Sequence, residues 1–214
     1  MNFLKRRDAL LDPLHVINNA FHKHRFIFIH VPKCAGSSIS LNLLGYQVGH
    51  TPYKTYEALL GKDLRHYFTF SIVRDPLIRF WSAYNFIEKG GITSDDKVYQ
   101  SNLGTPNDVL RGLAQGRRYT IHFDTQCKFL QSRQEYLTLN YIHKIENDID
   151  SLIRIIAENT DDHLATRIKS ALSTESKRNV ANKHPQGDTD LDLDLLFRVY
   201  EDDFWRLGYN PPDI

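Results

Sequence analysis

Two short runs of nearly uninterrupted apolar residues stand out in the first third of the chain. They cover residues 25–31 and 67–73, they are rich in β-branched and aromatic side chains, and a proline follows each of them, Pro32 or Pro76. This composition predicts two β-strands. Because polar positions are almost absent from both runs, we expect strands that are buried on both faces of a sheet.

Helical spacing of apolar residues follows the second run directly. From Leu77 to Tyr84 the apolar positions recur at intervals of three and four residues, which predicts an amphipathic helix. Asp75 is suited to the N-cap of this helix and Pro76 to its first position. The second predicted strand therefore leads straight into a helix.

The remaining patterned segments alternate between strand and helix. We expect a helix at 53–60, a strand at 138–145 and further helices at 149–156 and 191–204. The order strand, helix, strand is typical of a crossover between parallel strands. The sequence therefore predicts an α/β fold of three layers, in which helices flank a parallel sheet.

Length and charge narrow the class of protein. The chain has 214 residues, of which 41% are hydrophobic, so a packed core is expected and general disorder is excluded. We expect a single domain over 1–214, with flexible loops in the polar segments 90–107 and 160–190. A formal net charge of +1 provides no broad basic field, so nucleic acid is not an expected partner.

Cysteine usage and hydropathy indicate the compartment. Cys34 and Cys127 lie far apart in the sequence and form neither a C-x-x-C pair nor a set of metal ligands. No window approaches the roughly 18 apolar residues of a membrane-spanning helix. We therefore expect a cytoplasmic protein without a transmembrane segment, a disulfide scaffold or a bound metal.

The first concentration of chemistry lies where the first strand meets its helix. Residues 30–38 read HVPKCAGSS, and the N–H groups at a helix start attract anions. Gly36 permits a tight backbone, Ser37 and Ser38 offer hydroxyl donors, and Lys33 adds a mobile cation. These properties predict a phosphate-binding, P-loop-like turn. The competing interpretation is an ordinary strand-to-helix turn with capping serines and a solvated lysine.

This turn differs from the loop of nucleoside triphosphatases. In the pattern G-x-x-x-x-G-K-[ST] the lysine follows the last glycine, whereas Lys33 precedes Gly36 here. Acidic magnesium ligands are not evident either. A nucleotide kinase or NTPase-like phosphotransferase is therefore the weaker alternative function, and a non-catalytic nucleotide-binding module is another.

A second motif follows the second strand. Arg74 stands at the carboxyl end of that strand, and Ser82 lies about two turns into the next helix. Ligands of open α/β sheets bind at the carboxyl ends of strands, so we expect Arg74 near the first loop, where it could bind a second phosphate. The alternative is a local salt bridge between Arg74 and Asp75.

Both motifs together resemble a known family of enzymes. The pattern Pro32-Lys33-x-x-Gly36-Ser37-Ser38, followed by Arg74-Asp75-Pro76-x-x-Arg79-x-x-Ser82-x-Tyr84, resembles the sulfotransferases that use 3′-phosphoadenosine 5′-phosphosulfate. The similarity is greatest to the carbohydrate branch with chondroitin 4-O- and heparan/uronyl 2-O-sulfotransferases. It extends to His122-x-x-x-Gln126, to residues 141–147 and to Tyr200-x-x-Asp203-Phe204.

The resemblance implies a sulfate donor, an acceptor and a set of binding residues. The donor is 3′-phosphoadenosine 5′-phosphosulfate, the product is adenosine 3′,5′-bisphosphate, no metal is required, and the acceptor is a hydroxyl, expected on a carbohydrate or glycoconjugate. Arg74 and Ser82 would hold the 3′-phosphate. The residues assigned to the 5′-phosphosulfate are Pro32, Lys33, Cys34, Ala35, Gly36, Ser37 and Ser38.

The resemblance also suggests catalytic roles. Lys33 is expected to stabilise the leaving phosphate, and a histidine is expected to act as the base, since imidazole titrates nearest neutral pH. His50 matches the interval in which related 2-O-sulfotransferases carry their catalytic histidine, while His122 is assigned to positioning the acceptor. The alternative for His50 is a loop residue that caps the backbone of Thr51 or Tyr53.

Two carboxylates remain alternative bases. Glu57 is expected on a solvated helix face, and Glu146, beside Asn147, is expected to help cap the following helix.

Overall fold

The described residues form two compact units. The computed structural model describes residues 19–160, 164, 166 and 190–213. One unit, here called the sheet unit, combines the chain up to Val73 with the segment that begins at Lys128. The other, the helical unit, combines Arg74–Cys127 with the C-terminal segment. The assignment of residues 1–214 to a single domain remains a prediction.

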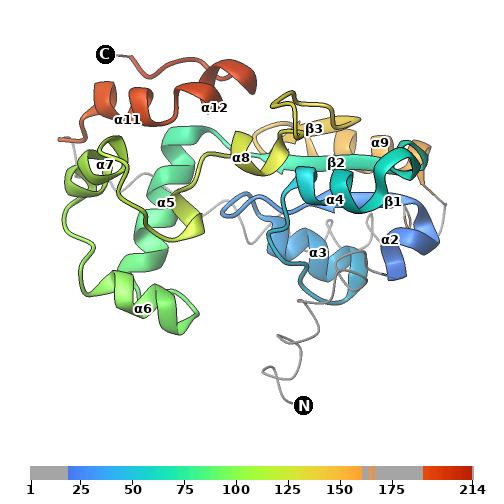
Figure 1. Cartoon of the computed structure of the whole chain (residues 1–214), viewed down its shortest axis with the longest axis horizontal. Coiled ribbons are helices and arrows are strands. Elements are labelled where there is room, and N and C mark those ends of the chain that lie inside the picture. Colours follow the sequence, from blue (N-terminus) through green and yellow to red (C-terminus); the bar gives the residue numbers. More distant parts are fainter. Residues whose placement is uncertain (1–18, 161–163, 165, 167–189, 214) are drawn as a thin grey trace. The chain divides into compact units, whose positions relative to one another are not determined.

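The sheet unit contains three parallel strands in the order β1-β2-β3 (Figure 1). They are β1 (Phe26–Ile29), β2 (Phe68–Val73) and β3 (Tyr141–Lys144). Phe28 pairs with Phe70 and Ser71 pairs with Ile142. All three strands were predicted, and the parallel α/β fold is confirmed.

Helices flank this sheet. They are α2 (Asn19–His24), α3 (Gly36–Leu44), α4 (Tyr53–Leu60) with the following 3-10 helix η3 (Gly61–His66), and α9 (Ile149–Asn159). The expected helix at 53–60 is confirmed at both ends, and the helix expected at 149–156 is longer by three residues. α9 begins at Asp148, whose carboxylate accepts from the N–H of Asp150. The N-cap of this helix is therefore Asp148, and the expectation that Glu146 helps to cap it remains a prediction.

The described residues of the helical unit form several helices in its first and last segments. They are α5 (Pro76–Glu88), α6 (Ser94–Gln100), α7 (Pro106–Ala114) and α11 (Leu193–Val199), with η4 (Ile121–Phe123) and α12 (Glu201–Arg206). α8 (Cys127–Leu130) crosses the division between the units along the chain. Asp75 caps α5 by accepting from the N–H of Ile78 at 3.0 Å, and Pro76 occupies the first turn. Both predictions for this helix start are confirmed.

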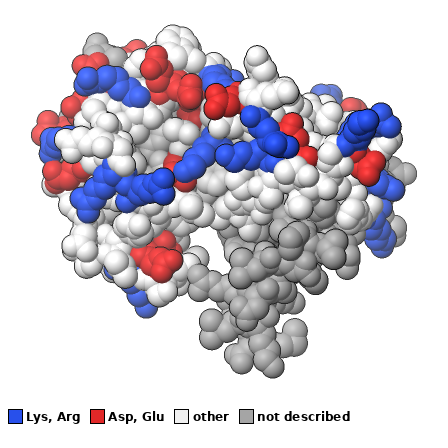
Figure 2. Space-filling model, in the orientation of Figure 1, with Lys and Arg blue, Asp and Glu red and all other residues white. Residues whose placement is uncertain are grey.

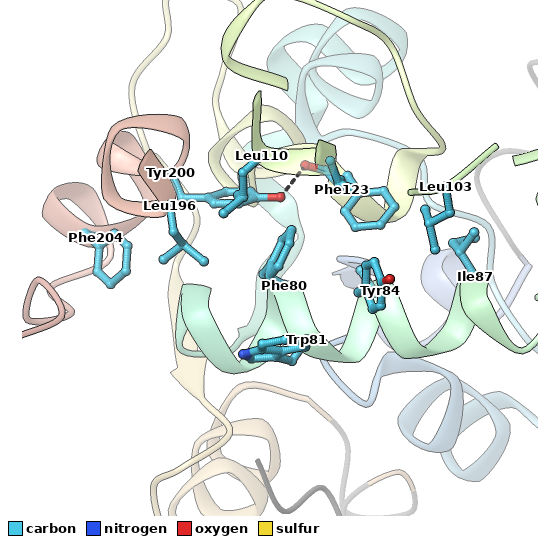
Figure 3. Packing of buried hydrophobic residues seen from close by; sticks show 12 residues of the cluster. Phe80, Trp81, Tyr84, Ile87, Leu103, Leu110, Phe123, Leu196, Tyr200 and Phe204 are labelled. Atoms are coloured by element: carbon cyan, nitrogen blue, oxygen red, sulfur yellow. Dashed lines mark hydrogen bonds between the residues drawn. The ribbon is translucent and has the colours of Figure 1, made fainter. Parts of the chain in front are cut away.

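A cluster of aromatic and aliphatic side chains forms the core of the helical unit (Figure 3). Phe80 is fully buried and packs with its ring centroid 6.0 Å from that of Phe123 and 6.3 Å from that of Tyr200. The Tyr200 hydroxyl donates to the carbonyl oxygen of Phe123 at 3.0 Å. Residues from α5, η4 and α11–α12 thus share one core, although more than 100 positions separate α5 from α11 in the sequence.

Two expected segments differ from the structure. The polar segment 90–107 contains α6, because Thr93 and Asp96 form a reciprocal capping box that stabilises a helix start without an apolar stripe. The helix expected at 191–204 is divided between α11 and α12 at Tyr200. Tyr200 leaves helical geometry there, with φ −114° and ψ 22°. The expected loop at 160–190 lies almost entirely outside the described residues.

Charged side chains of both signs are interspersed on the visible face of the molecule (Figure 2). This distribution agrees with the near balance of 27 basic and 26 acidic residues. Across the described ranges, no helix has both the length and the apolar character needed to cross a membrane.

Candidate active site

The turn after β1 has the backbone shape of an anion-binding loop. Lys33 and Ala35 have positive φ values of 68° and 58°, which are uncommon for residues with a side chain. Left-handed residues that alternate with right-handed ones turn successive N–H groups toward one side, and such concave backbones bind phosphate-like anions. The strained conformation therefore supports the anion-binding interpretation of residues 32–36.

The start of α3 continues this concave surface. Its N-cap is Ala35, which has no side chain able to accept from the N–H groups of the first turn. Ser37 and Ser38 occupy that turn and are only partly buried. Since α3 lacks a side-chain cap, its first turn is suited to an external anion.

The side chains of the turn divide into structural and exposed ones. Pro32 and Cys34 are buried, and the Cys34 thiol donates to the carbonyl oxygen of Pro32 at 3.6 Å. Lys33 is partly exposed. Cys34 therefore packs inside the turn, whereas Lys33 retains some exposure to solvent.

Gly36 is constrained by a neighbouring side chain. A Cβ atom at this position would overlap the imidazole of His30, with Nε2 only 2.6 Å away. His30 is 97% buried and directly follows β1. The loop can therefore pass this ring only because residue 36 has no side chain.

A pair of histidines joins this loop to the segment after α3. Nδ1 of His30 donates to the carbonyl oxygen of Val48 at 2.9 Å, and Nδ1 of His50 donates to the carbonyl oxygen of His30 at 2.8 Å. The two ring centroids are 4.1 Å apart. His50 is thus hydrogen-bonded to the residue that follows β1.

These hydrogen bonds determine the tautomers of both rings. A carbonyl oxygen only accepts, so Nδ1 carries the proton in each neutral ring and Nε2 carries the lone pair. A neutral histidine in this tautomer can accept a proton at Nε2, which is the property that a general base needs. His50 is partly exposed, whereas His30 is buried.

The second motif is organised within the helical unit. Arg74 is partly exposed, and its backbone forms two hydrogen bonds with the side-chain amide of Gln126, at 2.9 and 2.7 Å. Ser82 lies at the end of the second turn of α5 and is also partly exposed. The structure confirms where the sequence placed Arg74 and Ser82 along the chain; their roles toward a phosphate remain predictions.

A buried acidic residue from the C-terminal segment supports Gln126. The carboxylate of Asp203 accepts from the backbone N–H groups of Gln126 and Cys127 at 2.7 and 2.8 Å. Burial raises the pKa of Asp203, and the guanidinium of Arg79 and the two N–H groups counteract this rise. Burial, followed by the charge of Asp203, also raises the pKa of the Cys127 thiol, so this cysteine is not activated.

His122 has a different environment from His50. It belongs to η4 in the helical unit, its Nε2 lies 3.7 Å from Oδ1 of Asp96, and its ring packs edge-on against Phe86 at 4.7 Å. Its backbone carbonyl accepts from the guanidinium of Arg79 at 3.2 Å. The side chain is only 14% exposed. His122 is therefore built into the framework of this unit.

The alternative carboxylate bases also have defined positions. Glu57 accepts from the backbone N–H of Arg133 at 2.7 Å, so it links α4 to the segment before β3. Glu146 is exposed in the turn between β3 and α9.

Sequence reasoning overlooked three supporting residues. His30 is the first residue of the motif, and its place at the end of a buried strand is the sequence signal for its role. The family resemblance includes Gln126 and Asp203 without implying a role for them, and no local pattern relates them to Arg74. Within the described ranges there is no group of three or more His, Cys, Asp or Glu side chains able to hold a metal ion.

Comparison with known proteins gives one match. No curated protein and no solved structure matches the chain. A model described as "Sulfotransferase family" matches residues 19–210, which include the turn after β1, both histidines, Arg74, Gln126 and Asp203. This match covers nearly all of the chain, and the turn, the histidine pair and the Arg74 segment lie within it. The chain therefore belongs to the sulfotransferase family.

Proposed function

We propose that this sulfotransferase moves the sulfuryl group of 3′-phosphoadenosine 5′-phosphosulfate to a hydroxyl of a carbohydrate or glycoconjugate. The observation that carries the proposal is the turn after β1, where left-handed Lys33 and Ala35 precede a helix without a side-chain cap. Such a turn suits an anion whose oxygens accept several N–H groups at once. Membership of the family supplies the sulfuryl-transfer chemistry.

Within this proposal, two segments hold the two ends of the donor. The N–H groups of residues 34–38 and the hydroxyls of Ser37 and Ser38 bind the 5′-phosphosulfate. Arg74 and Ser82 bind the 3′-phosphate, since a guanidinium recognises a phosphate through paired hydrogen bonds. β1 and β2 are parallel neighbours, and each of the two segments follows one of them along the chain.

The proposed transfer is an in-line displacement at sulfur. The acceptor oxygen forms a bond to sulfur while the bond between sulfur and the bridging phosphate oxygen breaks, which releases adenosine 3′,5′-bisphosphate. Nε2 of His50 takes the acceptor's proton, because Nδ1 already donates to the carbonyl of His30. Lys33 stabilises the charge that develops on the bridging oxygen.

His122 has a supporting role in this proposal. Its contacts with Asp96 and Phe86 favour a part in shaping the acceptor side over direct proton transfer. We also propose a cytoplasmic location, on the basis of two buried cysteines that lie far apart in the sequence and form no disulfide within the described residues.

Thermal-shift measurements with nucleotides test the donor. Adenosine 3′,5′-bisphosphate should raise the melting temperature in the presence of a magnesium chelator, and it should do so at lower concentration than ADP or ATP. A ligand at 100 times its dissociation constant stabilises the folded state by about 2.7 kcal/mol. Equal shifts with ADP would contradict the proposal, because ADP lacks the 3′-phosphate.

The variant Arg74→Ala isolates the contribution of the 3′-phosphate site. It should lose about 1.5–3 kcal/mol of binding to adenosine 3′,5′-bisphosphate while binding ADP nearly as before. Calorimetric titration of both nucleotides measures the two values. Transfer of labelled sulfate from the donor to a panel of saccharides then separates an enzyme from a module that only binds the nucleotide.

A further inference from the structure

The backbone of Arg74 is held by a buried side chain rather than by the sheet. The backbone of Val73, the residue before it, still accepts from the N–H of Ile145 at 2.9 Å, in the manner of the strand ladder. At Arg74 the amide of Gln126 takes over both backbone groups: the N–H of Arg74 donates to Oε1, and Nε2 donates to the carbonyl of Arg74. Gln126 is fully buried.

This pairing specifies one orientation of the peptide groups around Arg74. A reciprocal pair of hydrogen bonds allows little rotation, since turning either peptide plane would leave a buried amide group unsatisfied. Arg74 stands one residue before the N-cap of α5. The pairing with Gln126 and the start of α5 together determine the direction in which the Arg74 side chain leaves the backbone.

Gln126 is itself anchored to the C-terminal segment. Its backbone N–H donates to Oδ2 of Asp203 at 2.7 Å, and the N–H of Cys127 donates to Oδ1 at 2.8 Å. Asp203 is fully buried, and the charge of the buried Arg79 compensates it. A chain of hydrogen bonds thus runs from α12 through Gln126 to the backbone of Arg74.

An apolar side chain would fill the same space without the cost of burying a polar amide. The hydrogen bonds of the amide, and not its volume alone, therefore account for a glutamine at this position. We propose that Gln126 is a positioning residue that orients Arg74 toward the 3′-phosphate and so sets the preference of the protein for 3′-phosphorylated donors, with Asp203 holding Gln126 in place. This inference rests on the proposed role of Arg74.

The test measures discrimination between two nucleotides. The ratio of the dissociation constant of adenosine 5′-phosphate to that of adenosine 3′,5′-bisphosphate reports the 3′-phosphate contact alone. Gln126→Met, which keeps the volume but not the hydrogen bonds, should reduce this ratio about tenfold. Gln126→Glu, which cannot donate to the carbonyl of Arg74, should reduce it to a similar extent.

Tyr200→Phe provides a matched control in the same unit. It removes the hydrogen bond between the Tyr200 hydroxyl and the carbonyl of Phe123 and contacts neither Gln126 nor Arg74 through any hydrogen bond described here. It should lower the melting temperature and leave the ratio unchanged. This control separates a general loss of fold stability from a loss of the orientation of Arg74.

The outcomes distinguish the inference from the function on which it rests. If Arg74→Ala leaves the ratio unchanged, the proposed 3′-phosphate site is wrong. If Arg74→Ala abolishes the preference while Gln126→Met and Gln126→Glu keep it within twofold, the positioning role of Gln126 is overturned. Should Gln126→Met fail to fold, the same ratio is measured for Gln126→Asn. This variant keeps an amide, but its side chain is too short to pair with both backbone groups of Arg74.

Discussion

The sheet unit and the helical unit hold their candidate anion-binding residues by different means. In the sheet unit, the turn with Lys33 and the histidine pair form a network over residues 30–50, with hydrogen bonds between positions 18 and 20 apart. In the helical unit, Arg74 depends on Gln126 and Asp203, and these hydrogen bonds join positions 52 and 77 apart. One site is supported locally and the other by distant segments.

This difference explains how each site can fail. The turn after β1 has a strained backbone that a buried ring and the start of one helix hold in place, so a change there acts directly on the turn. The Arg74 segment is stabilised by hydrogen bonds to the buried amide of Gln126, which the buried carboxylate of Asp203 holds in turn. A substitution in α12 can therefore alter the Arg74 segment without contacting it directly. Four predictions test this contrast.

The largest expected effect is on the proposed base. His50→Ala should lower turnover by roughly 10²–10⁴-fold, because no side chain then takes the proton of the substrate hydroxyl. The affinity for adenosine 3′,5′-bisphosphate should stay nearly unchanged. The acidic limb of the pH–rate profile should disappear with it. Steady-state kinetics and calorimetry measure the two quantities.

His122→Ala is the control for this assignment. It should lower turnover less than His50→Ala and leave the acidic limb in place, because His122 contacts Asp96 and Phe86 in the framework of the helical unit. The reverse result would exchange the roles of the two histidines.

The next largest effect is expected at Lys33. Lys33→Ala should lower turnover by roughly 10²–10³-fold and weaken product binding much less, since the ammonium group meets charge that develops in the transition state. Single-turnover rates compared with product affinity measure this difference. Cys34→Ala serves as the neighbouring control and should retain turnover, since the thiol packs inside the turn. An equal loss of turnover in both variants would contradict the role of Lys33.

A smaller effect is expected from filling the space at Gly36. Gly36→Ala should destabilise the fold by about 1–3 kcal/mol, because the new methyl group overlaps the buried imidazole of His30. Nucleotide binding should weaken as well, since the turn must move. Chemical denaturation measures the stability, and Gly45→Ala, where nothing lies within 4 Å of the added Cβ but φ is 77°, reports the cost of backbone strain alone.

The smallest effect is expected on acid stability of the helical unit. Burial would raise the pKa of Asp96, but hydrogen bonds from Thr93 and Ile92, together with the charge of His122, lower it. The ionised carboxylate therefore stabilises the folded state above about pH 4, and this contribution is lost as the pH falls through the lowered pKa.

Asp96→Asn should remove this dependence. Its free energy of unfolding should fall by roughly 1 kcal/mol near neutral pH, with less difference from the parent protein in strong acid. Denaturation curves between pH 2.5 and about pH 7 test the sign. A constant difference over that range would show that the carboxylate does not contribute through its charge.

The order of elements and the two motifs were predictable because they depend on local physics. Apolar runs identified β1 and β2, helical spacing identified α4 and α5, and the Asp75-Pro76 pair marked a helix start that the structure confirms. α6 was missed because its stability comes from a capping box rather than an apolar stripe. The break at Tyr200 was missed because a single amphipathic pattern covers both α11 and α12.

The sequence by itself determined the parallel α/β class, the position of the turn after β1 and the position of Arg74. Only the tertiary structure decided which side chains support them. The ring of His30 against Gly36 and the tautomer of His50 depend on tertiary contacts within residues 30–50, and the chain from Asp203 through Gln126 to Arg74 joins segments far apart in the sequence. Hydrogen bonds of this kind follow no local period, because burial and direction, rather than spacing along the chain, determine which donor meets which acceptor.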